Sequence, residues 1–68
     1  MKLKHLREKK QLTVRALASK AGMSYTYLFN VESGKADPSL STLTRIAKAL
    51  GVSVSTLVKD PPTGARRR

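Results

Sequence analysis

Residues 13–34 read TVRALASKAGMSYTYLFNVESG and predict two short helices joined by a tight turn. Apolar side chains recur at helical spacing in both halves: Leu17, Ala18 and Ala21 in the first, Leu28 and Val31 in the second. Between them, Gly22 can adopt the left-handed conformation that a turn between closely connected helices requires. Such a pair is a helix-turn-helix, whose second helix can lie in the major groove of DNA. The stretch therefore favours DNA binding over any enzymatic activity.

The chain has 68 residues, which is the size of one small domain. A domain of this size buries only roughly 60% of the surface that its unfolded chain exposes, which leaves no room for a deep substrate cleft. With four acidic residues, no cysteine and one histidine, His5, we expect no catalytic constellation and no metal site. We expect no cofactor and no small-molecule ligand.

Targeting signals are not evident in the sequence. The longest apolar runs are only a few residues, too short to cross a membrane. Residues 1–4 lead straight into an amphipathic helix, without the apolar core of a signal peptide. The expected location is the cytoplasm, at the nucleoid for a bacterial or phage protein.

The net charge is +10, from 14 lysines and arginines against four aspartates and glutamates. In so short a chain this imbalance favours a polyanionic partner such as double-stranded DNA. A merely soluble basic surface, a ribosomal role or a role at a membrane surface would give the same balance. The charge alone does not separate these classes.

The spacing of apolar residues predicts five helices and no strand, and hence an all-α fold. The first helix carries Leu3 and Leu6 on one face, with charged side chains on the others. Hydroxyl side chains suited to cap the next three helices are Thr13, Ser24 and Ser39.

The fourth helix has the most regular apolar stripe in the chain. The stripe consists of Leu40, Leu43, Ile46, Ala47 and Leu50. Gly51 ends this helix, and Ser53 begins a short fifth helix. The fifth helix is expected to close the core with Val54, Leu57 and Val58.

Residues 60–68, DPPTGARRR, combine two prolines, a glycine and three arginines, and predict a disordered basic tail beyond a domain at residues 1–59. Arg66, Arg67 and Arg68 could enter a minor groove or follow the phosphates as a flexible arm. Alternatively, they make no specific contact.

An ordered set of motifs runs through residues 1–59. It consists of Leu3-x-x-Leu6-Arg7, Leu12-Thr13, Leu17-Ala18, Gly22, Ser24, Tyr27-Leu28, Glu32-Ser33-Gly34-Lys35, Pro38-Ser39-Leu40, and Ile46-Ala47-Lys48-Ala49-Leu50-Gly51-Val52-Ser53. At these spacings the chain resembles the Cro/repressor-type helix-turn-helix family, also called the xenobiotic-response-element family. The resemblance implies a compact five-helix, lambda-repressor-like DNA-binding domain with its helix-turn-helix at helices two and three. It also implies a dimer on a two-fold operator.

A helical wheel places Thr26 and Asn30 on the side of the recognition helix that faces away from the domain. Asn30 can pair with adenine through two hydrogen bonds, and Thr26 offers a hydroxyl and a methyl group to base edges. The resemblance implies that Tyr25 reads bases too. Phe29 could either pack within the domain or contact a thymine methyl group. We expect Tyr27 to pack partly, with its hydroxyl at a phosphate.

Phosphate contacts are expected at the starts of helices two and four, where main-chain amides carry partial positive charge. Thr13 and Ser39 lie at these starts, and the resemblance implies a phosphate contact from Lys35. Many relatives carry a phosphate-binding glutamine where this chain has Val14. Arg15 can replace that contact with a charge-assisted one, or stay a solvated side chain. The complete expected set is Arg7, Thr13, Val14, Arg15, Ser24, Tyr27, Lys35 and Ser39.

The resemblance also implies an ion pair between Arg7 in helix one and Glu32 at the end of the recognition helix. This pair would fix the angle between the two helices and leave Arg7 free to touch a phosphate as well. For both residues, the structural role outweighs the functional one.

The sequence thus predicts a non-enzymatic regulator of transcription that binds double-stranded DNA in a sequence-specific way, with repression the expected outcome. A homodimer would place two recognition helices in successive major grooves, about 34 Å apart. It is expected to use Val52, Val54 and Val58, and could form only when DNA brings two copies together. Two alternatives remain: the DNA-binding antitoxin of a toxin–antitoxin pair, and a module that bridges transcription factors or binds RNA.

Overall fold

Five α-helices make up the part of the chain that the structure, a computed structural model, describes: residues 1–59. They are α1 (Leu3–Lys9), α2 (Val14–Ala21), α3 (Tyr25–Glu32), α4 (Leu40–Leu50) and α5 (Val54–Val58). No strand occurs within residues 1–59, which confirms the predicted all-α fold of five helices. None of these helices combines the length and the apolar content that crossing a bilayer needs. The predicted tail, residues 60–68, lies outside the described residues.

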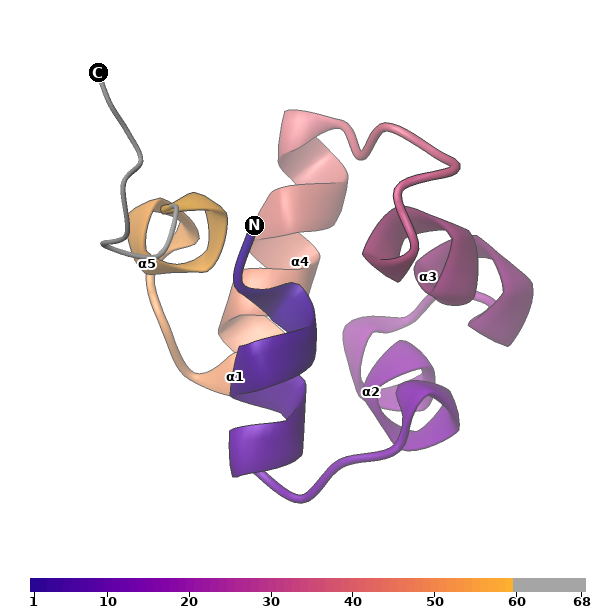
Figure 1. Cartoon of the computed structure of the whole chain (residues 1–68), viewed down its shortest axis with the longest axis horizontal. Helices are drawn as coiled ribbons and strands as arrows, with labels where there is room; N and C mark the ends of the chain where they lie inside the picture. Colours follow the sequence, from indigo (N-terminus) through magenta and orange to yellow (C-terminus); the bar gives the residue numbers. More distant parts are fainter. Residues whose placement is uncertain (60–68) are drawn as a thin grey trace.

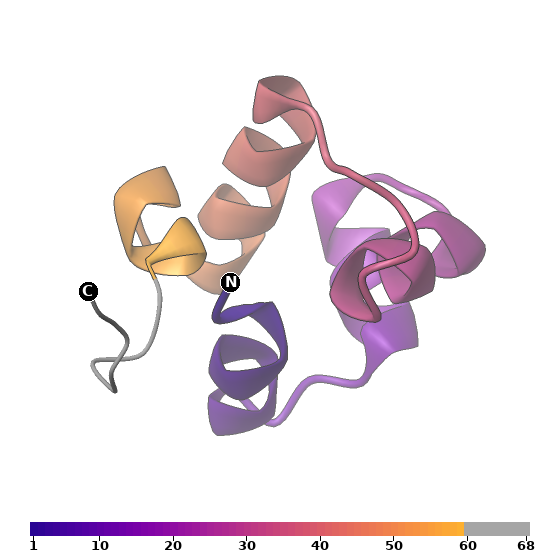
Figure 2. The same cartoon turned by 45° about the horizontal axis from the view of Figure 1, so that its top comes forward.

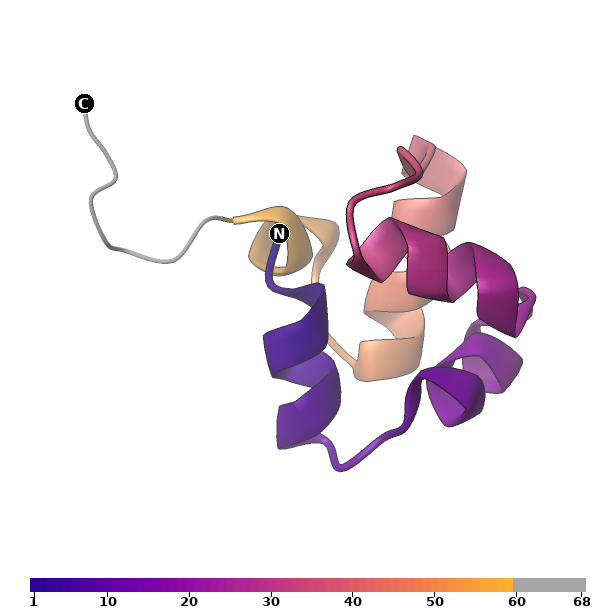
Figure 3. The same cartoon turned by 45° about the vertical axis from the view of Figure 1, so that its right-hand side comes forward.

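Helix α4 occupies the centre of the fold and packs against both α2 and α5 (Figure 1). Helix α3 packs against α2, and α1 packs against α5. The main-chain amide of Lys2 donates to the carbonyl of Leu57 at 2.8 Å, which ties the start of the chain to α5. In the turned views, α2 and α3 lie together on the side of the molecule away from α5 (Figures 2 and 3). The helix-turn-helix is therefore carried on one side of a scaffold of α1, α4 and α5.

Four of the helices begin at a hydroxyl side chain that satisfies an otherwise unpaired amide. The oxygens of Thr13, Ser24, Ser39 and Ser53 accept hydrogen bonds of 3.0–3.1 Å from the amides of Ala16, Tyr27, Thr42 and Thr56. Such N-caps each stabilise a helix by about 1 kcal/mol. The predicted capping role of Thr13, Ser24 and Ser39 is confirmed.

The turn between α2 and α3 is made by Gly22, which has a φ of +73°. The amide of Met23 donates to the carbonyl of Ala18 at 3.0 Å, the hydrogen bond that closes a helix end of this kind. The same arrangement ends α1, where the amide of Leu12 donates to the carbonyl of Arg7 at 3.0 Å. There the left-handed residue is Gln11, with a φ of +60°. This conformation is costly for a residue with a Cβ atom. The sequence pattern does not predict a left-handed residue at Gln11.

The core draws apolar side chains from every helix. The buried set is Leu3, Leu17, Ala18, Ala21, Leu28, Val31, Ile46, Ala47, Leu50 and Leu57. No polar or charged side chain is buried among residues 1–59. All five apolar residues predicted for residues 13–34 belong to this set, so the apolar faces of both helices of the motif are confirmed.

Two residues assigned to the core lie outside it. Leu40 is 72% exposed, although it belongs to the stripe of α4. At about 100° per residue it lies about 70° from the centre of that stripe, and in the first turn of the helix, so no neighbour covers it. Val58 is 41% exposed because α5 ends there and the chain continues in an extended conformation at Lys59.

Candidate nucleic-acid interface

The inward face of α3 sets the direction of its outward side chains. Leu28 and Val31 are buried in the core, and the Ser24 cap fixes the first turn. As a result Thr26 is exposed, as the helical wheel predicts. Asn30 is half-buried, and its carbonyl accepts hydrogen bonds from the amides of the two residues that follow Gly34, at 2.8 and 3.1 Å.

Three side chains form a stack on the surface of α2 and α3. The guanidinium carbon of Arg15 lies 4.9 Å from the centre of the Tyr25 ring. The Tyr25 and Phe29 rings are stacked, with their centres 6.0 Å apart and their planes inclined by 19°. We call these three residues the Arg15–Tyr25–Phe29 stack. The spacing of four residues between the two aromatics could have predicted their contact, whereas the position of Arg15 on a different helix could not be read from the sequence.

Phe29 is 44% exposed and Tyr25 41%. Neither residue belongs to the core, so the interpretation that Phe29 completes the core is wrong, although its ring packs on Tyr25. Part of the Phe29 ring is available to a partner. Both Arg15 and Thr26 are exposed beside these rings.

Tyr27 lies half-buried against the core, so its predicted partial packing is confirmed. Its hydroxyl lies 3.3 Å from the side-chain oxygen of Thr42, which in turn accepts a hydrogen bond from the Ser39 hydroxyl at 3.0 Å. The recognition helix and the start of α4 are thereby connected through three hydroxyl groups. The sequence pattern does not predict a role for Thr42. Its position three residues after the capping Ser39 is, however, the one from which a side chain can contact the cap.

Phosphate contacts were also predicted for residues at the starts of α2 and α4 and for Lys35. Thr13 and Ser39 are exposed and cap these helices, whereas the side chain of Val14 packs partly against the core. Only the main chain of Val14 could reach a phosphate, because its side chain has no polar atom. Lys35 is exposed in the connection between α3 and α4.

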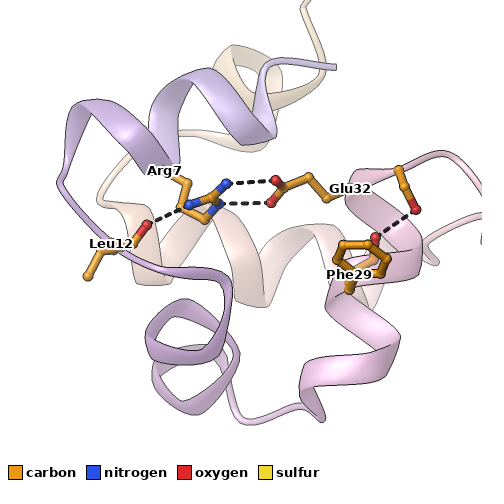
Figure 4. A network of polar contacts seen from close by, with 5 residues as sticks. Arg7, Leu12, Phe29 and Glu32 are labelled. Atoms are coloured by element: carbon orange, nitrogen blue, oxygen red, sulfur yellow. Dashed lines mark hydrogen bonds and ion pairs between the residues drawn. The ribbon is translucent and has the colours of Figure 1, made fainter.

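Arg7 and Glu32 form the predicted ion pair (Figure 4). The Nε and Nη2 groups of Arg7 donate to the two carboxylate oxygens of Glu32 at 2.9 and 2.8 Å. The Nη1 group donates to the carbonyl of Leu12 at 2.7 Å. The hydrogen bond to Glu32 raises the pKa of Arg7 above its ordinary value, although burial of the guanidinium opposes this. Since at least three of its five N–H donors are engaged, Arg7 serves the structure, and its phosphate contact stays a prediction.

Much of the positive charge lies away from the recognition helix. Lys10, Lys20, Arg45 and Lys48 line two shallow hollows that share Lys20, Lys48 and Ala49. None of the residues lining these hollows belongs to α3 or to the first turn of α2 or α4. Lys20 belongs to the last turn of α2, and the Nη1 group of Arg45 donates to the carbonyl of Gly22 at 3.3 Å, so two of these cations lie at the back of the helix-turn-helix. All four add to the long-range field of the protein.

Comparison with known proteins finds relatives along most of the chain. An immunity repressor protein of Bacillus phage phi105 is 44% identical over 59 residues, which make up 87% of this chain and 41% of the repressor. An uncharacterized HTH-type transcriptional regulator of Sinorhizobium fredii, y4dJ, is 39% identical over 64 residues, 90% of this chain and 83% of that protein. This chain thus spans less than half the length of the phage repressor and most of the length of y4dJ.

The fold also occurs among solved structures. A chain of the SinR protein/SinI protein complex is similar with a TM-score of 0.80 and 34% sequence identity, over 85% of this chain and 57% of that chain. A sequence model described as helix-turn-helix matches residues 3–57, from the start of α1 into α5. The chain therefore belongs to the helix-turn-helix family, of the Cro/repressor type that its motifs resemble.

Proposed function

We propose that this protein binds double-stranded DNA in a sequence-specific way and regulates transcription, with repression as the outcome. The observation that carries the proposal is the outward face of α3, where Tyr25, Thr26 and Phe29 are exposed. This helix contacts the capped first turns of both neighbours, through Arg15 of α2 on the Tyr25 ring and through the Tyr27 hydroxyl beside Thr42 of α4. A helix presented in this way fits the major groove while helix N-termini approach the phosphates. The phage immunity repressor and the HTH-type regulator among its relatives support the same function.

The proposal gives each of these residues one of two roles. Base edges would be read by Tyr25, Thr26, Phe29 and Asn30. Phosphates would be held by the main-chain amides at the starts of α2 and α4, by Thr13, Ser24, Ser39 and the Tyr27 hydroxyl, and by Arg15 and Lys35. Base contacts specify the sequence, whereas phosphate contacts position the protein without reading it.

We further propose that two copies act together on a two-fold operator, through the region of α5. Val58 is 41% exposed, while Val52 and Val54 are half-buried against the core. The interface would thus be small, and DNA would supply much of the dimer's stability. The solved relative is a complex of two proteins, which supports a protein partner as well. A regulator of this kind acts where the DNA is, in the cytoplasm at the nucleoid.

Selection of bound duplexes from a random library tests the proposal. The expected result is an enriched sequence with two-fold symmetry, bound at least about 1,000-fold more tightly than bulk DNA. Sedimentation of the complex should then give two protein chains per duplex, and one chain on a half-site. Asn30→Ala should relax the preference for one base pair in each half-site.

The same measurement separates the other functions. Sequence-indifferent binding, or RNA that competes as well as the selected duplex, would overturn the operator proposal in favour of a bridging or RNA-binding module. Specific binding that requires a second protein in the sample would favour the antitoxin.

A further inference from the structure

We propose that the Tyr25 and Phe29 rings of the Arg15–Tyr25–Phe29 stack form a single apolar reading surface for the C5-methyl groups of thymine, in which Arg15 acts as a positioning residue. This inference rests on the proposed DNA binding and names the chemistry that the recognition helix reads. It goes beyond a contact by Phe29 alone, because it joins residues of two helices into one unit.

The stack leaves two aromatic rings at the surface in a fixed arrangement. Single exposed apolar side chains are ordinary on proteins. Here, however, two exposed rings contact each other at 6.0 Å between centres and continue into the proposed reading face at Thr26. An apolar patch on the proposed DNA-binding face has one apolar counterpart in the major groove, the thymine methyl group.

Arg15 covers the Tyr25 ring, with its guanidinium carbon 4.9 Å from the ring centre. Phe29 stacks on the same ring. Together the two contacts restrict the rotation of Tyr25 about its side-chain bonds. A guanidinium that stacks on a ring keeps its in-plane N–H donors available. Arg15 can therefore hold Tyr25 in place and bind a phosphate at the same time, and the fixed ring loses less freedom on binding.

The dimensions of the stack set the size of its target. The 6.0 Å between the ring centres corresponds to roughly two base-pair steps of about 3.4 Å. The two rings would therefore face methyl groups within two to three consecutive base pairs. This predicts a half-site that contains two thymines within that span, on either strand.

Replacing thymine by uracil in the selected duplex tests the inference, since this removes the methyl group and keeps every hydrogen-bonding group. Each thymine of a half-site is replaced in turn, and the dissociation constant of the full chain is measured by fluorescence anisotropy at fixed salt. At two neighbouring positions we expect binding to weaken by about fourfold each, the factor that burial of one methylene-sized group gives. If no thymine position responds while the duplex is still bound specifically, the inference is wrong and the proposed function stands. If the library enriches no sequence, both the inference and the proposed function are wrong.

Variants of the protein then assign the effect to the stack. With Phe29→Ala, the thymine-to-uracil ratio at one of these positions should fall from about four to about one. Since Phe29 is 44% exposed, the variant is expected to fold, and a thermal melt checks this. A ratio that survives in folded Phe29→Ala would assign the methyl contact to another residue and overturn the inference.

Arg15→Lys separates positioning from phosphate binding. Lysine keeps the charge but has no planar group to lie on the Tyr25 ring. We expect the salt dependence of binding to stay as in the wild type, while the uracil discrimination facing Tyr25 decreases. Unchanged discrimination would show that Arg15 does not position Tyr25. Lys20→Ala, another exposed cation of α2 that lies outside the stack, is the matched control and should leave the discrimination unchanged.

Discussion

The Arg7 guanidinium and the Glu32 carboxylate, 25 residues apart in sequence, meet in two parallel hydrogen bonds of 2.9 and 2.8 Å. They join the first helix of the scaffold to the last turn of the recognition helix, as Figure 4 shows. Their side chains are only 11% and 10% exposed, so this contact is stronger than an ordinary surface ion pair. The ion pair fixes the orientation of α3 relative to α1.

Glu32→Ala should therefore destabilise the domain, because it leaves the largely buried Arg7 charge without its partner. Loss of one member of a fully buried pair costs about 3–5 kcal/mol, and with this partial exposure we expect about 2 kcal/mol. A thermal melt should show a midpoint lower by roughly 10 °C. Glu8→Ala, which removes an exposed acid of α1, is the control. Equal melting of Glu32→Ala and the wild type would contradict the structural role of the pair.

A second prediction concerns Gln11, the one described residue other than glycine with a positive φ. Because its Cβ atom is strained in the left-handed conformation, Gln11→Gly should stabilise the domain by up to about 1 kcal/mol. The converse change, Gly22→Ala, should destabilise by about 1–2 kcal/mol. At Gly22 the reason is the backbone conformation alone, since a Cβ atom there would meet nothing within 4 Å. Denaturant unfolding of the two variants should move the midpoint in opposite directions, and a shift in the same direction would refute the assignment.

A third prediction compares two leucines of the α4 stripe that the sequence pattern treats alike. Leu50 is 1% exposed and Leu40 is 72% exposed. Leu50→Ala should cost about 2–5 kcal/mol, enough to unfold much of so small a domain, because it leaves a cavity in the core. Leu40→Ala should change the stability little. Circular dichroism at increasing temperature distinguishes them, and comparable losses would mean that Leu40 is covered in solution.

A fourth prediction concerns two exposed lysines, Lys35 beside the recognition helix and Lys48 in the hollow at the far end of α4. Lys35→Ala should weaken binding to all duplexes alike, and reduce the slope of log affinity against log salt by about one, because one phosphate contact is lost. Lys48→Ala removes the same charge from a place outside the proposed contacts and should leave that slope unchanged. The measurement is a salt titration with the selected duplex. If the two variants give equal slopes, the charge acts through the general field and Lys35 binds no phosphate.

Much of the fold could be predicted from local patterns. The hydroxyl caps at Thr13, Ser24 and Ser39 and the glycine turn at Gly22 mark helix ends by chemistry that acts within a few residues. The apolar spacing of residues 13–34 identified its buried side chains correctly. The Arg7–Glu32 pair was implied by the family resemblance alone. Nothing in a spacing of 25 residues predicts that these two charges meet.

The sequence by itself determined where α2, α3, α4 and α5 begin, where α2 and α4 end, and which faces of α2 and α3 are apolar. These features depend on hydrogen bonds and periodicity along the chain. Only the tertiary structure decided which members of a stripe are covered, and so left Leu40 exposed. It alone brought Arg15 of α2 onto the Tyr25 ring of α3 and gave Gln11 a left-handed conformation. The physical reason is that burial and stacking depend on the positions of neighbouring helices, and the pattern within one helix does not contain these positions.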